Sequence, residues 1–220
     1  MNCSYKTLHA ESMTFRIPRL YAIIDAAQSG SRSSAALAEV LVASGVRLIQ
    51  YRDKAGSSRQ IFDASCEIAR RVQQSTGIFI VNDRADIARA VGANGVHLGQ
   101  DDLRIEQARQ ALAPGQWAGL STHNLAQVVE ADAAPADYIA FGPIFSTRSK
   151  ERPDPVVGLE GLREARKKTS KPLVAIGGIT LANARSVIEA GADSVAVIQD
   201  LLGAEDVAAR ARKVLQILAE

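Results

Sequence analysis

From residue 20 onward the chain repeats one pattern: a short apolar run, a few polar or glycine residues, and a segment whose apolar residues recur three and four positions apart. Short bounded apolar runs are typical of buried strands, and the three-and-four spacing is typical of a helix face. The sequence therefore predicts strand-then-helix units, with strands at 20–24, 46–51, 78–81, 95–98, 117–120, 138–141, 172–176 and 194–198.

Polar residues and glycines mark the ends of the predicted helices. Ser33 or Ser34 is placed to cap the first helix, and Gly45 follows its last turn. Near the other end of the chain, Thr180 is expected to cap a helix that stops at Gly191. A last helix runs over residues 207–218.

Eight such units admit few architectures. Parallel strands joined by helical crossovers form either an open doubly wound sheet or a closed barrel, and eight is the number at which a barrel closes. We predict an α/β protein with one (β/α)8 TIM barrel over residues 19–220, preceded by a flexible N-terminal arm at 1–18. The doubly wound sheet stays open as an alternative, because periodicity does not report closure. The long connection over 144–157 predicts a lid.

Charge and composition narrow the classes of partner. The 220 residues carry 26 basic and 24 acidic side chains, a net charge of +2, which gives no electrostatic reason to expect nucleic acid or a membrane as partner. No apolar stretch approaches the roughly 18–20 residues of a spanning helix. Two cysteines, Cys3 and Cys66, do not make a disulfide framework, so we expect a reducing, cytoplasmic compartment. A homo-oligomer is left open.

Basic residues follow the second predicted strand. Gln50, Arg52 and Lys54 alternate, so in an extended chain they share one face. In a barrel the carboxyl ends of the strands form the functional rim, and two cations partly removed from water there indicate an anionic ligand. The alternative is that both cations reach solvent or pair with Asp53 and Asp101.

Carboxylates end the next two strands. Asp83 and Asp102 follow consecutive strands, so we expect them to be neighbours on the rim. Two carboxylates beside a basic cluster favour a hard, oxygen-preferring ion such as Mg²⁺ shared with phosphate oxygens. In the competing interpretation, each Asp caps the helix that follows it.

Glycines follow the seventh strand. Gly177 and Gly178 expose backbone N–H groups at the place where this fold commonly binds phosphate, although a close-packed turn would also need them. His97 and His123 are expected to be structural hydrogen-bonding residues, without a catalytic role. Ser121 has no partnered His/Asp arrangement that would make it a nucleophile. Trp117, Phe79 and Phe141 are expected in the core.

Seven segments together resemble the thiamin phosphate synthase (thiamine-phosphate pyrophosphorylase) family. The resemblance runs from residue 20 to about residue 215, and the order of the motifs is more specific than any one of them. The segments are LYAIID at 20–25, QYRDK at 50–54, VNDR at 81–84, GVHLGQDDL at 95–103, GLSTH at 119–123, DYIAFGPIFSTRSK at 137–150 and VAIGGIT at 174–180.

The resemblance implies a transferase of thiamine biosynthesis. It would join an aminopyrimidine methyl diphosphate to hydroxyethylthiazole phosphate, with Mg²⁺ as cofactor and small phosphorylated molecules as its partners. The implied pyrimidine-diphosphate contacts are Gln50, Arg52, Lys54, Asn82, Ser121 and Lys150, of which Arg52, Lys54, Ser121 and Lys150 are the implied catalytic residues. The implied Mg²⁺ ligands are Asp83 and Asp102, and the implied thiazole-phosphate contacts are Thr147, Ser149, Gly178, Ile198 and Gln199.

One position departs from the family pattern. The eighth strand ends in Ile198-Gln199, where the family usually has Val-Ser. If the backbone N–H at this position contacts the thiazole phosphate, the change to Gln199 is tolerable. If the hydroxyl of the usual Ser is required, the change weakens thiazole-phosphate binding. The resemblance otherwise implies catalysis by leaving-group stabilisation, without a protein nucleophile.

Three other functions compete with the synthase. A related thiazole tautomerase has a similar barrel but needs neither a diphosphate nor a metal, and Asp102 together with a complete QYRDK segment argues against it. Another phosphate-binding barrel enzyme would share the glycine pair but has no reason to combine Asp83, Asp102 and Lys150. A non-catalytic phosphate-ligand-binding barrel is the third, and Gln199 is its one indication.

Overall fold

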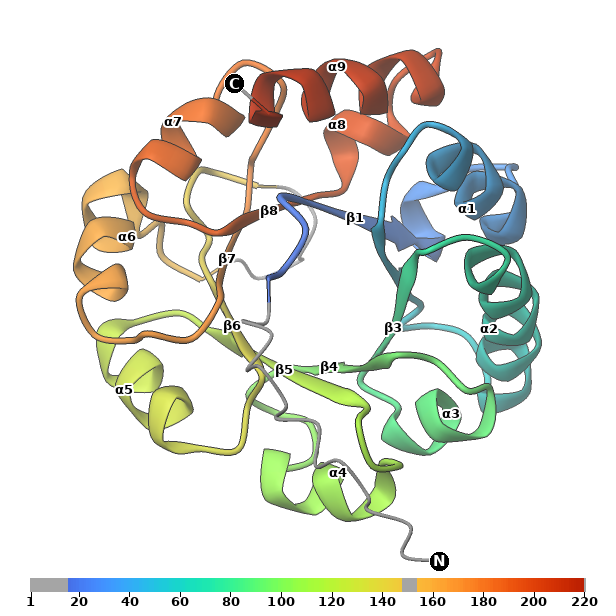
Figure 1. Cartoon of the computed structure of the whole chain (residues 1–220), viewed down its shortest axis with the longest axis horizontal. Coiled ribbons are helices and arrows are strands. Elements are labelled where there is room, and N and C mark those ends of the chain that lie inside the picture. Colours follow the sequence, from blue (N-terminus) through green and yellow to red (C-terminus); the bar gives the residue numbers. More distant parts are fainter. Residues whose placement is uncertain (1–15, 148–153, 220) are drawn as a thin grey trace, which may run out of the picture.

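The computed structural model describes residues 16–147 and 154–219. Eight parallel strands in this part of the chain close into a barrel in chain order, and helices surround them (Figure 1). The α/β class and the TIM barrel are confirmed, and the open doubly wound sheet is wrong. The strands are β1 (Leu20–Asp25), β2 (Leu48–Arg52), β3 (Ile78–Asn82), β4 (Gly95–Leu98), β5 (Trp117–Thr122), β6 (Tyr138–Phe141), β7 (Leu173–Ile176) and β8 (Ser194–Val197).

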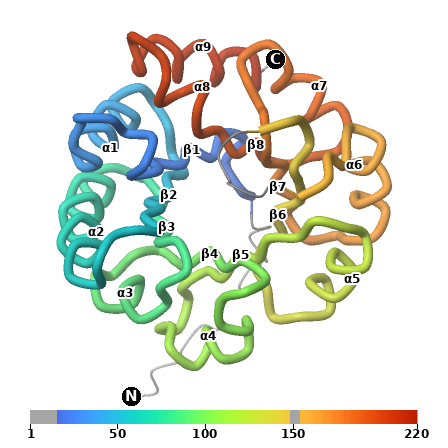
Figure 2. The backbone as a smooth tube through the Cα atoms, turned by 180° about the vertical axis from the view of Figure 1, so that it is seen from behind, coloured from blue at the N-terminus to red at the C-terminus, as the bar shows by residue number. Residues whose placement is uncertain are grey.

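Closure rests on the pairing of the first strand with the last. β1 pairs with β2 on one side and with β8 on the other, where Leu20 is in register with Val195. The crossovers lie outside the strand ring, as the view from behind also shows (Figure 2). They contain α1 (Ser34–Ala43), α2 (Ser58–Gln73), α3 (Ala85–Ala90), α4 (Ile105–Ala111), α5 (Leu125–Ala133), α6 (Gly158–Arg166) and α7 (Ala184–Glu189). Two further helices, α8 (Gln199–Leu202) and α9 (Val207–Ala219), follow β8.

Alternation along each strand separates two apolar layers. One face of the strands packs against the helices, with side chains such as Phe79 and Phe141 fully buried, as expected for core residues. The other face fills the barrel interior, where Tyr21, Leu48 and Tyr138 pack together. Every second residue of a strand therefore points into the barrel, and the last inward residue of each strand reaches the rim.

Helix ends follow the predicted pattern at one helix and depart from it at another. Ser33 precedes α1, and Gly45 after it has φ +93°, a conformation that glycine adopts without strain. Thr180 is not an N-cap, because α7 begins only at Ala184. The Thr180 N–H instead donates to the Asn183 side chain, at 2.8 Å. The predicted cap was therefore placed one turn too early.

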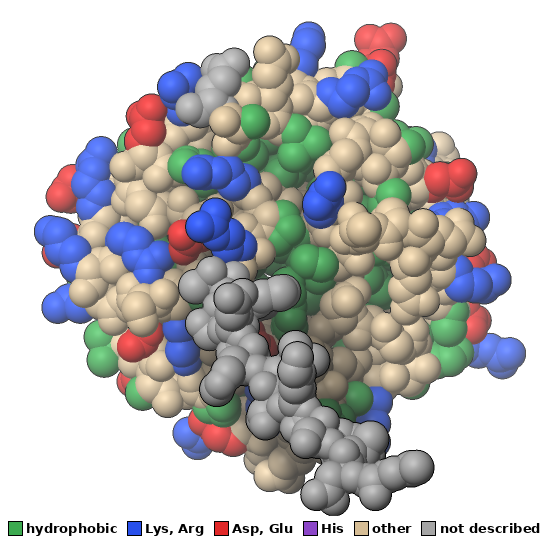
Figure 3. Space-filling model, viewed as in Figure 1, with side chains coloured by type: hydrophobic (Ala, Val, Ile, Leu, Met, Phe, Trp, Pro, Cys, Tyr) green, Lys and Arg blue, Asp and Glu red, His purple; other side chains and the backbone are tan. Residues whose placement is uncertain are grey.

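Charges of both signs lie on the outer surface. The space-filling view shows basic and acidic side chains interspersed around the periphery of one face, with hydrophobic side chains at its middle (Figure 3). In the described part of the chain, no helix is long and apolar enough to cross a membrane. The arm predicted at 1–18 lies mostly outside the described residues, and Ile17, which is described, is buried against the barrel interior.

Candidate active site

A cavity of about 660 Å³ opens where the strands end. Strand-end residues from both sides of the barrel line it, together with the start of the 144–157 connection and residues of α8 and α9. Among the predicted site residues, those on its wall are Gln50, Arg52, Asn82, Ser121, Thr147, Gly178, Ile198 and Gln199. The structure thus brings residues separated by up to about 150 positions in the chain to one cavity.

Arg52 is held by a buried carboxylate. Its guanidinium forms an ion pair with Asp25, at the end of β1, and the Asp25 side chain is only 2% exposed. Asp25 also accepts a hydrogen bond from the Ala27 N–H, at 3.0 Å. Sequence reasoning missed Asp25, although its place at the end of the first strand was the available signal. The pair fixes Arg52 on the cavity wall and offsets the cost of burying its charge.

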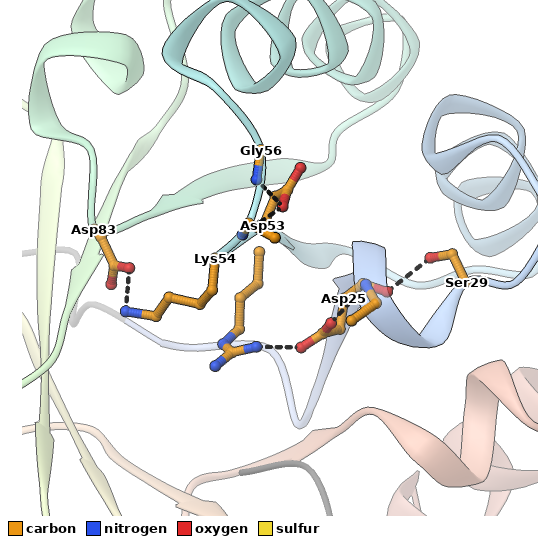
Figure 4. Close-up of polar contacts among 9 residues, drawn as sticks. Asp25, Ser29, Asp53, Lys54, Gly56 and Asp83 are labelled. Atoms are coloured by element: carbon orange, nitrogen blue, oxygen red, sulfur yellow. Dashed lines mark hydrogen bonds and ion pairs between the residues drawn. The ribbon is translucent and has the colours of Figure 1, made fainter. Parts of the chain in front are cut away.

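Lys54 reaches away from its own loop toward the next strands. Its ammonium pairs with Asp83 (Figure 4). It also lies 3.9 Å from the Asp102 carboxylate. The alternative pairing with Asp53 is wrong, because the Asp53 carboxylate turns into its own loop and accepts from the Gly56 N–H at 2.8 Å. These three residues form a charged cluster, named here the Lys54–Asp83–Asp102 cluster, beside the lined cavity.

Backbone conformation aims both carboxylates of this cluster. Asp83 has φ +61°, a left-handed conformation that non-glycine residues rarely adopt and that clusters at functional sites. Asp102 accepts from the Gly99 N–H, at 2.7 Å. Neither residue caps a helix, since the cap positions of α3 and α4 belong to Arg84 and Arg104. The helix-cap interpretation of the two carboxylates is therefore wrong.

The two carboxyls influence each other's protonation. Burial raises the pKa of Asp83 to about 6, the contact with Asp102 adds to the rise, and Lys54 opposes it. Burial also acts to raise the pKa of Asp102, but hydrogen bonds from Asp83 and the Gly99 N–H, with the charge of Lys54, hold that pKa below its ordinary value. Opposite pKa shifts in two neighbouring carboxyls indicate that the two titrate as a coupled pair, in which Asp83 takes up the first proton.

Two histidines also line the cavity. His97, from β4, contacts the Ser121 hydroxyl through Nε2 at 2.9 Å. His123 contacts the Gly142 carbonyl through Nδ1 at 2.8 Å and lies 3.5 Å from the Asp154 carboxylate. Both make structural hydrogen bonds as expected, but sequence reasoning did not place them in the cavity. The inward parity of His97 on its strand was the signal for it.

The glycine pair after β7 lies at the cavity, as expected for a phosphate site, and also forms a close-packed turn. Gly177 and Gly178 line the cavity, and both have positive φ. A Cβ at Gly178 would lie 2.5 Å from the Ser146 carbonyl oxygen, so the turn also packs closely against the 144–157 connection. This contact sets the position of neighbouring Thr147 on the cavity wall.

The end of β8 carries an ion pair that the sequence did not suggest. Gln199 begins α8, and the next residue, Asp200, binds Arg210 of α9 at 2.7 Å. Asp200 also accepts from the Leu181 N–H, at 3.0 Å, so it joins the β7 and β8 loops. Ser149 and Lys150 lie outside the described residues.

A closed (β/α)8 barrel with charged side chains gathered at the carboxyl ends of its strands has the arrangement of the TIM-barrel enzymes, which place their active sites at this face. The family model described as thiamine monophosphate synthase matches residues 20–201. The chain belongs to this family.

Relatives cover nearly the whole chain. A thiamine-phosphate synthase of Koribacter versatilis is 55% identical over 92% of this chain and 97% of its own length. Another, of Methanoregula boonei, is 48% identical over 88% of this chain and 89% of its own length. A solved thiamine phosphate pyrophosphorylase of Pyrococcus furiosus has a TM-score of 0.81 and 34% identity, covering 91% of this chain and 95% of the other.

Proposed function

We infer that this enzyme is a thiamine-phosphate synthase, a transferase of thiamine biosynthesis. It joins an aminopyrimidine methyl diphosphate to hydroxyethylthiazole phosphate and releases pyrophosphate. Membership of the family supports the reaction. The observation that carries the assignment to this site is the Lys54–Asp83–Asp102 cluster beside Arg52, because a leaving diphosphate needs both a cation site and fixed positive charge.

Asp83 and Asp102 are suited to hold Mg²⁺. Both offer carboxylate oxygens, the ligands that this ion prefers, and they lie close enough to share a proton. The described residues contain no group of three or more His, Cys, Asp or Glu side chains that could hold a metal. The pair therefore suits an ion that takes its other ligands from water and substrate phosphate. Bound there, Mg²⁺ supplies neutralisation of the charge that develops on the leaving diphosphate.

Arg52 and Lys54 supply the fixed positive charge. Asp25 orients Arg52, so the guanidinium is in place before substrate binds. Lys54 is 52% exposed and turns from Asp83 to the diphosphate oxygens as these enter. The roles that the family resemblance gives to Lys150 and Ser149 remain predictions, since both residues lie outside the described part of the chain.

Ser121 acts by hydrogen bonding, and the reaction uses no protein nucleophile. The nearest base, His97, has its other ring nitrogen beside the Tyr138 hydroxyl, at 3.0 Å. In the Ser–His–Asp triad the corresponding ring nitrogen donates to a carboxylate, whereas here it contacts a phenol. Substitution at the methylene carbon therefore proceeds with departure of the diphosphate ahead of attack by the thiazole nitrogen, inside a cavity that limits access of water.

The thiazole phosphate binds at the opposite wall. Gly178 and the residues after β8 present backbone N–H groups there, and Thr147 offers a hydroxyl. Ile198 and Gln199 hold the place where the family pattern has Val-Ser. We assign the protein to the cytoplasm, where both phosphorylated substrates would be its partners, and leave its oligomeric state to measurement.

A coupled assay tests this function. Purified protein is mixed with both substrates, with and without Mg²⁺, and thiamin phosphate and pyrophosphate are measured. We expect equal amounts of the two products, formed only with Mg²⁺. Folded protein that forms neither product would contradict the assignment, and conversion of the thiazole substrate alone would favour the tautomerase.

A further inference from the structure

Five polar side chains form a continuous chain of hydrogen bonds across the floor of the cavity. In order they are Gln50, Tyr21, Tyr138, His97 and Ser121, and we name them the tyrosine relay. The successive contacts are 2.7 Å, 3.0 Å, 3.0 Å and 2.9 Å. The relay therefore joins β2, β1, β6, β4 and β5 through the barrel interior, with two predicted substrate-binding residues at its ends.

Packing holds the relay rigidly. The Tyr21 and Tyr138 rings meet edge to face, with centroids 6.1 Å apart, and the His97 ring stacks on Tyr138 at 5.5 Å. Gly119 makes room for this arrangement, because a Cβ there would lie 2.0 Å from Cζ of Tyr138. Two fully buried phenols at the centre of a barrel are costly unless each hydroxyl is hydrogen-bonded. The relay gives both phenol hydroxyls their hydrogen-bond partners.

Burial keeps both phenols protonated. It raises the pKa of Tyr21 and of Tyr138 well above the ordinary value of 10. Each hydroxyl therefore has one proton to donate and an oxygen that accepts.

The amide of Gln50 gives the relay a fixed donor at one end, and one proton order uses every hydroxyl proton along it. The Gln50 side-chain N–H donates to the Tyr21 oxygen. When Tyr21 donates in turn to Tyr138, Tyr138 donates to Nδ1 of His97, and the neutral imidazole carries its proton on Nε2. That Nε2–H then donates to Ser121. In this order each of the four contacts is served by one proton.

We propose that the tyrosine relay fixes the Ser121 hydroxyl as a hydrogen-bond donor to the substrate, with Tyr21, Tyr138 and His97 as positioning residues. Because Ser121 accepts from His97, its own proton is left for the ligand. The substrate atom at Ser121 must then be an acceptor, such as a ring nitrogen of the aminopyrimidine. This assignment rests on the proposed function for the identity of the ligand, but the proton order belongs to the free protein.

The tautomer of His97 tests the proton order without any substrate. The chain has three histidines, so long-range ¹H–¹⁵N spectra of histidine-labelled protein are simple to assign with H97Q and H123Q. We expect His97 to bear hydrogen on Nε2 alone. His123 is an internal control, because its contact with the Gly142 carbonyl requires hydrogen on Nδ1. Hydrogen on Nδ1 of His97, in either a neutral or a charged ring, would overturn the proposal.

Removal of one phenol hydroxyl tests the coupling. Y138F should give His97 a mixture of tautomers and raise the KM for the pyrimidine diphosphate about tenfold, with the KM for thiazole phosphate unchanged. Y51F is the matched control, since Tyr51 donates to Asp53 outside the relay. If Y138F does not fold, Y21F serves instead. An unchanged His97 tautomer and KM in the folded variant would overturn the proposal.

The two proposals fail in different ways. If the protein shows the expected His97 tautomer but forms no thiamin phosphate, the relay is supported and the synthase assignment is contradicted. If the protein forms thiamin phosphate but carries hydrogen on Nδ1 of His97, the synthase assignment is supported and the relay is contradicted.

Discussion

The two sides of the cavity are built from different parts of the chain. At the ends of β1 to β4, side chains define the site: Arg52 forms an ion pair with Asp25, and Lys54 pairs with Asp83 and lies near Asp102. At the ends of β6 and β7, backbone defines it, with Gly177 and Gly178 packed against the 144–157 connection. Charged side chains suit a group whose charge changes during reaction, while a fixed backbone cradle suits a phosphate that stays intact.

Loss of Lys54 should have the largest effect on the side-chain wall. K54A removes a charge that stabilises the leaving diphosphate, so kcat/KM should fall by about 10²–10³. The free energy of unfolding should change by no more than about 1 kcal/mol, because half-exposed pairs contribute little. K167A, which removes an exposed lysine paired with Glu164 on α6, is the control for both measurements. Equal turnover of K54A and wild type would remove Lys54 from the mechanism.

A methyl group at Gly178 should damage the backbone wall. G178A combines a left-handed φ of +62° with a Cβ placed 2.5 Å from the Ser146 oxygen. We expect a loss of about 2–3 kcal/mol in stability and a rise of about tenfold in the KM for thiazole phosphate.

G115A separates strain from contact. Gly115 has φ +83° with open space around its Cβ position. The free energy of unfolding of G115A, measured by chemical denaturation, should be about 1 kcal/mol lower than that of wild type, and both KM values should be unchanged. A KM effect as large in G115A as in G178A would contradict the role of the cradle.

Gln199 offers a smaller change on the same wall. Q199S restores the residue type usual in the family and adds a hydroxyl at the N-terminal residue of α8. The KM for thiazole phosphate should fall by about two- to fivefold, a gain within the range of one modest hydrogen bond. The KM for the pyrimidine diphosphate should not change. If neither constant moves, the backbone N–H makes this contact and the departure is neutral.

The smallest effect concerns pH. The folded protein holds the Asp83 proton more tightly than the unfolded chain does, because the pKa of Asp83 is raised to about 6 from an ordinary 3.8. Its stabilising contribution is thus present below about pH 4 and is lost as the pH rises through 6. In metal-free buffer, the Tm of wild type should fall relative to that of D83N between pH 4 and 7. A difference in Tm between wild type and D83N that stays constant over this pH range would contradict the raised pKa of Asp83.

The sequence pattern predicted eight strand-then-helix units, and their number favoured a barrel, but the pairing of β1 with β8 that closes it does not show in the periodicity. Alternation along the second strand correctly placed Gln50 and Arg52 on the cavity wall, and the position of Asp83 and Asp102 after consecutive strands correctly made them neighbours. The pattern did not reveal the left-handed backbone of Asp83, which is a local conformation that periodicity does not report. It also did not reveal the Asp25–Arg52 pair, which depends on the register of β1 against β2. The relay was likewise hidden, because Tyr21 and Tyr138 lie 117 residues apart and resemble ordinary core residues in sequence.

Binding of inorganic pyrophosphate with Mg²⁺ tests most directly which wall holds the leaving group. Calorimetry would compare wild type, the double variant D83N/D102N and G178A. We expect the double variant to bind at least about tenfold more weakly and G178A to bind within about twofold of wild type. Retained affinity in D83N/D102N together with lost affinity in G178A would place the diphosphate on the backbone wall and contradict the division of the cavity.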